Sequence, residues 1–240
     1  MIKFFRKIRQ RLLSESKFSK YLLYAIGEII LVVIGILIAL QINNWNENKK
    51  LQKEEAKLLN ALKKEIESNI AIIDSTIIDN DTILKISGRL IKLGLASPDF
   101  KLTAPDMIQS LGYNTNKHET SIINEILGTN SRALISNDET IVKLRTLKQA
   151  YDRADKTEFY LDEFWNSKVT NFFAKSGLGV YFVSANTNEN YKPDFLLNKE
   201  FYSLLGIMNA YQLSLLYSRK DLEEELNKTL LFLNEQKNQN

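Results

Sequence analysis

The chain of 240 residues contains no cysteine and only one histidine, His118. Without cysteine there are no disulfide bonds, thiol nucleophiles or thiolate metal ligands, and one histidine cannot supply a site that needs two imidazoles. The motifs of phosphate-binding loops, nucleophile elbows and zinc proteases are absent as well. We therefore expect no metal, no cofactor and no enzymatic activity.

The excess of positive charge is confined to the first twenty residues. The whole chain has a net charge of +3. Residues 1–20 hold seven basic side chains against Glu15, a net +6, so the remainder has a net charge of −3. A domain that binds nucleic acid needs a basic surface to neutralise phosphates. The slightly acidic remainder therefore argues against nucleic acid as a partner.

One long apolar run is present, over residues 21–42, and Glu28 is its only charged residue. A hydrocarbon core of about 30 Å needs about 20 such residues in a helix. A cleaved signal peptide would have a shorter apolar region that ends in small residues. This run instead has Gln41 near its end and is followed by Asn43. The sequence predicts a basic cytoplasmic segment over 1–20, an uncleaved transmembrane helix over 21–42 and an extracytoplasmic domain over 43–240.

The residues on either side of the run predict its orientation and its lipid contacts. Lysine and arginine are retained on the cytoplasmic side, and they are more numerous before the run than after it. Aromatic side chains suited to the two headgroup regions flank it: Tyr21, Tyr24 and Trp45. The N-terminal segment either lies on anionic lipid as a basic helix or only sets the orientation; its basic residues are Lys3, Arg6, Lys7, Arg9 and Arg11.

The stretches FFRKIRQ and KYLLYAIGEIILVVIGILIALQINNWNE resemble a family of single-pass bacterial membrane proteins of flavobacterial type, the domain-of-unknown-function 6090 family. The likeness is close over about residues 1–50 and weaker beyond. It implies a protein of the cytoplasmic (inner) membrane whose outer domain lies in the periplasm. It implies no activity, ligand or functional residue.

Beyond the apolar run, leucine and isoleucine recur at helical spacing with lysine and glutamate between them. We expect a long helix that is either continuous or bent at residues 79–82. Gly94, together with Pro98, is predicted to end this helix. Short helical turns are predicted in the broken stretch that follows, at 106–111 and 118–127.

Two further long helices complete the predicted fold. The first begins at Ser136, whose Ser-x-x-Glu pattern predicts a capping box, and ends at Gly177. Residues 178–197 are predicted to form a loop, and Asn198 is predicted to cap the last helix. The fold class is therefore all-α: an N-terminal transmembrane helix followed by an elongated extracytoplasmic helical bundle.

Glu28 is the most informative single residue, because an ionisable group within a membrane span is costly unless it is neutralised, paired or near the interface. At 100° per residue, Glu28 shares one helix face with Gly35 and Ala39. Small residues allow close helix approach, and a glutamate can form a hydrogen bond across the contact. We favour a helix–helix contact here over the alternative, a carboxylate that reaches toward headgroups without a partner.

Other candidate residues carry weaker signals. Asp155, Glu158 and Asp162 share a helix face and could bind a hard cation, but interleaved basic residues favour a solvated face. His118 has no partner that marks it as a catalytic base, and a surface position is favoured. The aromatic residues of the last hundred positions belong mostly to the core; four of them could line a cleft or a partner surface, namely Tyr160, Trp165, Tyr181 and Tyr202.

These observations favour a membrane-anchored interaction or scaffold protein. Its expected partners are membrane lipid and either another protein or a second copy of the chain. One alternative is a sensor that binds a small ligand in the bundle and acts through a separate output protein. A membrane-tethered hydrolase is the third alternative, and it would need a buried Ser–Lys or carboxylate pair.

The charge asymmetry yields a test of topology. A reporter fused after Asn240 should lie outside the cytoplasm, because the basic residues before the span are retained inside. Alkaline phosphatase at this position should therefore be active, and a fluorescent protein that folds only in the cytoplasm should be dark. An active fluorescent reporter with inactive phosphatase would reverse the predicted orientation.

Overall fold

The structure is a computed structural model that describes residues 18–96, 109–114, 117–128, 131–177 and 199–237. Its elements are α2 (Phe18–Ala96), α4 (Ser121–Leu127), the short 3₁₀ helix η1 (Arg132–Leu134), α5 (Asp138–Phe164), the π-helical turn η2 (Trp165–Val169), α6 (Thr170–Ser176) and α8 (Lys199–Lys237). The described residues contain no strand. The predicted all-α class is confirmed. The chain divides into two units, residues 1–56 and 57–240.

The first unit contains the apolar part of α2. Its large apolar side chains from Leu22 to Ile42 are all exposed, with exposed fractions between 46% at Val33 and 77% at Leu23. The protein has one helix that is long and apolar enough to cross a membrane, among the residues described. The side chain of Tyr21 and all of residues 1–17 lie outside the described residues, so the predicted basic helix lies outside them too.

The second unit begins with residues 57–96 of α2. The helix is continuous through residues 79–82. Asn80 is buried at this point and its amide donates to Gln212 of α8. This buried polar residue is thus hydrogen-bonded to a neighbouring helix, and α2 stays helical around it. The helix ends at Ala96, between Gly94 and Pro98, the two residues predicted to end it.

The long helix that follows is α5, extended by η2 and α6. It begins at Asp138, and its N-cap is Asn137, whose side chain accepts a hydrogen bond from the backbone N–H of Glu139 at 2.8 Å. The predicted capping box at Ser136 is therefore displaced by one residue, because asparagine is at least as good an N-cap as serine. Gly177 has a φ of 73° and ends α6 as predicted, since a left-handed conformation favours glycine.

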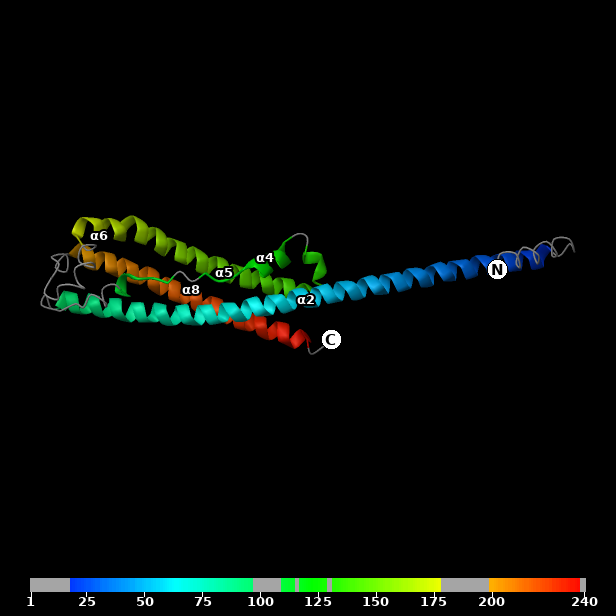
Figure 1. Ribbon diagram of the computed structural model, residues 1–240, viewed down its shortest axis with the longest axis horizontal. Helices are drawn as coiled ribbons and strands as arrows, with labels where there is room; N and C mark the ends of the chain where they lie inside the picture. Colours follow the sequence, from blue (N-terminus) through cyan, green and yellow to red (C-terminus); the bar gives the residue numbers. More distant parts are fainter. Residues whose placement is uncertain (1–17, 97–108, 115–116, 129–130, 178–198, 238–240) are drawn as a thin grey trace. The chain divides into compact units, whose positions relative to one another are not determined.

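The two long helices that follow α4 are α5 and α8, and they run antiparallel. Thr140 near the start of α5 bonds to Gln236 near the end of α8, and Arg153 further along α5 pairs with Asp221 at 2.5 Å. Residues 57–96 of α2, α5 and α8 lie side by side in Figure 1. The predicted loop at 178–197 and the predicted cap Asn198 lie outside the described residues.

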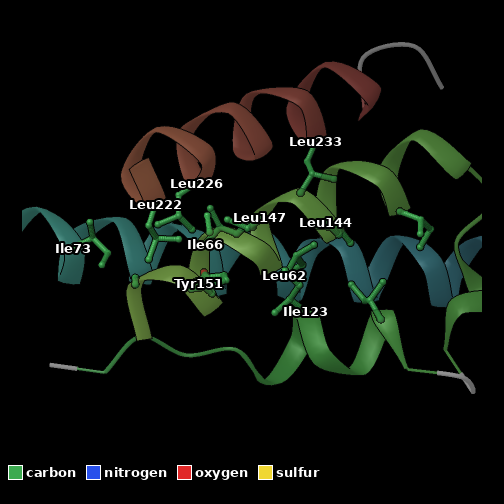
Figure 2. Close-up of a cluster of buried hydrophobic side chains, with 14 of the residues drawn as sticks. Leu62, Ile66, Ile73, Ile123, Leu144, Leu147, Tyr151, Leu222, Leu226 and Leu233 are labelled. Carbon is green, nitrogen blue, oxygen red and sulfur yellow. The ribbon is translucent and has the colours of Figure 1, made fainter. Parts of the chain in front are cut away.

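Two clusters of buried side chains hold these helices together. Figure 2 shows the first, where three helices and the short α4 meet; its members include Leu62, Ile66, Ile73, Ile123, Leu144, Leu147, Tyr151, Leu222, Leu226 and Leu233. The second lies around η2 and the start of α8 and is richer in aromatic residues; its members include Leu90, Leu111, Leu161, Val169, Phe172, Phe201, Leu205 and Met208. Burial of these apolar side chains is the main stabilising term.

The first cluster yields a stability prediction. Leu144→Ala should lower the free energy of unfolding by about 2–5 kcal/mol, because Leu144 is 0% exposed and its truncation leaves a cavity. The matched control is Val142→Ala on the same helix, where the side chain is 60% exposed and the loss should be about 0.5 kcal/mol or less. Denaturant unfolding of the full chain in detergent, followed by circular dichroism, measures both. Equal losses would contradict the packing described here.

Candidate functional site

The apolar helix of the first unit carries the predicted contact face. Glu28 is half-buried and Ala39 is exposed. A Cβ added at Gly35 would meet no other atom within 4 Å, so packing within the described chain does not require glycine there. Of the predicted interface anchors, Tyr24 is 56% exposed and Trp45 is 58% exposed.

Trp45 also contacts a cation one helical turn further on. The Lys49 ammonium nitrogen lies 3.8 Å from the centroid of the Trp45 ring. Such a cation–π contact between side chains one helical turn apart is favourable. The predicted surface residues Lys3, Arg6, Lys7, Arg9 and Arg11 lie outside the described residues.

In the second unit, a non-helical segment crosses the bundle just before α4. We call its described residues, 112–114 and 117–120, the strap. The sequence predicted a helix from His118, but α4 begins only at Ser121. The backbone before that point bonds to side chains of the bundle, which replace the hydrogen bonds that a helix would have supplied.

Buried side chains from two helices bind the backbone of the strap. Gln212 donates to the carbonyl of Gly112 at 3.0 Å, and Arg219 donates to the carbonyl of Asn114 at 2.6 Å. Asn69 of α2 binds Glu119 twice: its amide nitrogen donates to the carbonyl at 2.6 Å, and its oxygen accepts from the N–H at 2.8 Å. The bundle thus recognises main-chain groups of the strap.

Carboxylates on either side bind the side chains of the strap. The Asn114 amide donates to Asp79 of α2 at 2.7 Å. His118 Nε2 lies 3.1 Å from an oxygen of Asp155, and the Tyr113 hydroxyl donates to Asp162; both aspartates belong to α5. Three strap side chains therefore supply a donor to an acidic acceptor.

The sequence favoured a solvated acidic face on α5, whereas in the structure its acidic side chains bind other parts of the chain. Asp155 and Asp162 bind the strap, and Glu158 lies 3.4 Å from the guanidinium of Arg219. The partners come from elsewhere in the chain, so helical spacing alone could not reveal them. Among the residues described, no group of three or more His, Asp or Glu side chains could hold a metal ion.

Burial shapes the electrostatics beneath the strap. The side chain of Arg219 is 3% exposed, and its burial lowers the pKa of the guanidinium. Burial also raises the pKa of Glu158, while the nearby Arg219 acts in the opposite direction. The pKa of Tyr113 is raised to about 12, first by burial and then by its bond to Asp162. Tyr113 is therefore a hydrogen-bond donor at neutral pH.

His118 is held by its surroundings. Its side chain is 8% exposed, and its ring lies 4.6 Å from the ring of Tyr151, between centroids. The Tyr151 hydroxyl accepts from Asn69 at 2.7 Å, so the histidine and the asparagine belong to one network. The expected surface position of His118 is wrong, because its imidazole attaches the strap to α5.

A buried glutamate fixes the start of α4. Glu65 of α2 is 5% exposed and accepts from the Ser121 hydroxyl at 2.9 Å and from the N–H groups of Ile122 and Ile123 at 2.7 and 3.2 Å. It thereby satisfies helix N–H groups that have no partner within α4. Sequence reasoning missed Glu65 as a cap.

A sequence signal for this network existed. The buried residues of α2 recur at steps of three and four, and polar residues take several of these core positions: Glu65, Asn69, Thr76, Asn80 and Ser87. Buried polar groups are nearly always hydrogen-bonded. Polar residues at core positions of an otherwise apolar stripe therefore predict a partner segment, although they do not identify it.

Three of the four predicted aromatic residues are described, and two of them pack against the same cluster. Trp165 and Tyr202 pack against the second cluster, and the Trp165 ring nitrogen donates to the carbonyl of Leu111 at 2.8 Å. Tyr160 is 45% exposed beside Phe159, with 6.1 Å between the ring centroids. Tyr181 lies outside the described residues.

Comparison with known proteins matches the chain to one family. The model of a family of unknown function, DUF6090, matches residues 28–212. The matched region includes Glu28, the strap and Gln212, whereas Arg219 lies beyond it. No curated protein and no solved structure matches the chain.

The Asp155–His118 pair predicts a dependence of stability on acid. The bond from His118 lowers the pKa of Asp155 below its ordinary value of 3.8. A lowered folded-state pKa means that the pair contributes to stability above the unfolded pKa and that this contribution is lost as the pH falls below it.

We therefore expect the parent to be more stable than Asp155→Asn at pH 6, with a difference that shrinks as the pH falls toward 3. Denaturant unfolding of both chains across this range measures the difference. The control is Asp152→Asn, which removes an exposed pair with Lys148 and should change stability by about 1 kcal/mol or less. If the stability difference between the parent and Asp155→Asn grew as the pH fell, the Asp155–His118 pair would not be what holds the strap.

Proposed function

The chain belongs to the domain-of-unknown-function 6090 family, and we propose that it is a membrane-anchored interaction protein. In this proposal α2 crosses the cytoplasmic membrane once and residues 1–20 remain in the cytoplasm. The helical domain lies in the periplasm and binds another envelope protein or a second copy of the chain. The partners are therefore lipid and protein.

One observation carries the membrane part of the proposal. Every large apolar side chain from Leu22 to Ile42 is exposed. An exposed apolar surface of this extent is unfavourable in water, and a helix satisfies its own backbone groups within lipid. The flanking Tyr24 and Trp45 are suited to the headgroup regions.

Glu28 and Gly35 support the interaction part. They share a face of the apolar helix, and nothing within the described chain packs against the space where a Gly35 side chain would be. A neighbouring helix could approach closely at Gly35 and exchange a hydrogen bond with Glu28. The anchor would then contribute to association as well as to location.

Substitutions on this face test the proposal. Glu28→Gln should largely preserve association, because an amide can still form the hydrogen bond. Glu28→Leu should weaken association about three- to twentyfold, since interhelical hydrogen bonds in membranes contribute about 0.6–1.7 kcal/mol. Gly35→Leu should weaken it by separating the two backbones.

The measurement is energy transfer between labelled full-length chains in bilayers, with chemical cross-linking and purification in mild detergent to detect other partners. Leu37→Val is the control, because Leu37 lies about 200° around the helix from Gly35. A strictly monomeric chain without a co-purifying protein, unaffected by any of these changes, would overturn the proposal.

A further inference from the structure

The strap is attached to the bundle by polar contacts between two apolar anchors. Leu111 on one side is 4% exposed and belongs to the second core cluster. Ile123 on the other side is 0% exposed and belongs to the first. Between Leu111 and Ser121, two described side chains touch the core: the His118 imidazole lies beside Tyr151, and Tyr113 packs against the edge of the second cluster. Departure of the strap from the bundle would break these two aromatic contacts and leave both apolar anchors in place.

The surface beneath the strap is built to bind an extended main chain. We call this surface the groove; it consists of Asn69 and Asp79 of α2, Asp155 and Asp162 of α5, and Gln212 and Arg219 of α8. Asn69, Gln212 and Arg219 bind only backbone atoms of the strap in the contacts given above. Backbone groups are common to all polypeptides, so these contacts do not depend on the strap's own side chains.

The acidic members of the groove select the side chains. Asp79, Asp155 and Asp162 accept hydrogen bonds from an amide, an imidazole and a hydroxyl of the strap. Carboxylates accept strong hydrogen bonds from such donors, and they disfavour acidic side chains through charge repulsion. The groove therefore suits a segment with donor side chains and without negative charge at these positions.

A buried acceptor lies next to the groove. Asn80 is 1% exposed; its amide nitrogen donates to the side-chain oxygen of Gln212 at 2.7 Å, and Gln212 in turn donates to the strap. The side-chain oxygen of Asn80 is buried and has no hydrogen-bond partner among the described residues. Burial of an unpaired acceptor is costly, so the polar layer beneath the groove holds one hydrogen-bonding group that the strap does not satisfy.

We propose that the groove is a docking site for an extended segment of a partner protein, and that the strap occupies this site within the same chain. The segment carries hydroxyl, amide or imidazole donors where the strap has Tyr113, Asn114 and His118. This inference rests on the proposed function as an interaction protein and names where the partner binds. The strap is then an autoinhibitory contact that a partner displaces.

Exchange of the strap for a partner segment is physically consistent with the contacts. Segments with few buried apolar contacts open locally at a lower free energy than the core. A partner segment would restore the hydrogen bonds of Asn69, Gln212 and Arg219, so that none of these buried groups stays unpaired. The affinity of the partner would be reduced by the fraction of time for which the strap is closed.

The experiment compares a clamped and a loosened strap in the full chain in detergent. The chain has no cysteine, so Asp79→Cys with Asn114→Cys introduces a single pair of thiols at two side chains that touch. Mass spectrometry of the oxidised chain verifies that the disulfide has formed and clamps the strap. The loosened chain carries Tyr113→Phe, Asn114→Ala and His118→Ala, which change the strap and leave every groove residue intact. The probe is a fluorescent peptide with the sequence of residues 109–120.

Fluorescence anisotropy should show that the loosened chain binds the peptide at least about tenfold more tightly than the oxidised clamped chain, because a closed strap excludes the peptide. Reduction of the disulfide should restore binding to the clamped chain. A control peptide with alanine at the three donor positions should bind weakly to both. Circular dichroism verifies that the helices are unchanged.

Two results would overturn the inference: no binding to a folded, loosened chain, or equal binding to the loosened and the oxidised clamped chains. Neither result depends on a natural partner. If the chain co-purifies with a partner but does not bind the peptide, the proposed function is supported and the docking groove is contradicted. If the chain binds the peptide but purifies alone, the docking groove is supported and the proposed function is contradicted.

Discussion

Polar side chains at buried positions of two helices set the central constraint on this protein. Asn69, Gln212 and Arg219 occupy core positions of α2 and α8 and cannot remain unpaired, since a buried polar group without a partner costs about 1–3 kcal/mol. The strap supplies carbonyl and N–H groups that pair with them. The polar interior and the non-helical segment therefore depend on each other.

This constraint also explains why the bundle has two apolar clusters with a polar layer between them. Leu111 and Ile123, at the two ends of the strap region, belong to different clusters. The contacts of the strap lie between these anchors and fix its register along α5, where Asp155 and Asp162 are seven residues apart. Apolar burial supplies stability, and the polar layer supplies the position of the crossing segment.

The two units face different physical demands. The side chains of residues 57–93 in α2 change between buried and exposed at helical spacing, which suits one face packed against a bundle. The large apolar side chains from Leu22 to Ile42 are exposed on every side of the helix, which suits surroundings that are apolar on every side. In the proposed function, lipid supplies those surroundings, and Glu28 lies on the face where a neighbouring helix would pack.

The sequence by itself determined the helical class, the candidate membrane span and the end of α6 at Gly177, because apolar periodicity, run length and a left-handed glycine are local properties. It did not reveal the strap, the cap of α4 by Glu65 or the position of His118. Each of these depends on partners at least 35 positions away, such as Asp79 for Asn114. Only the tertiary structure decided which distant donor meets which acceptor, since helical spacing places a residue on a face but does not say what covers that face.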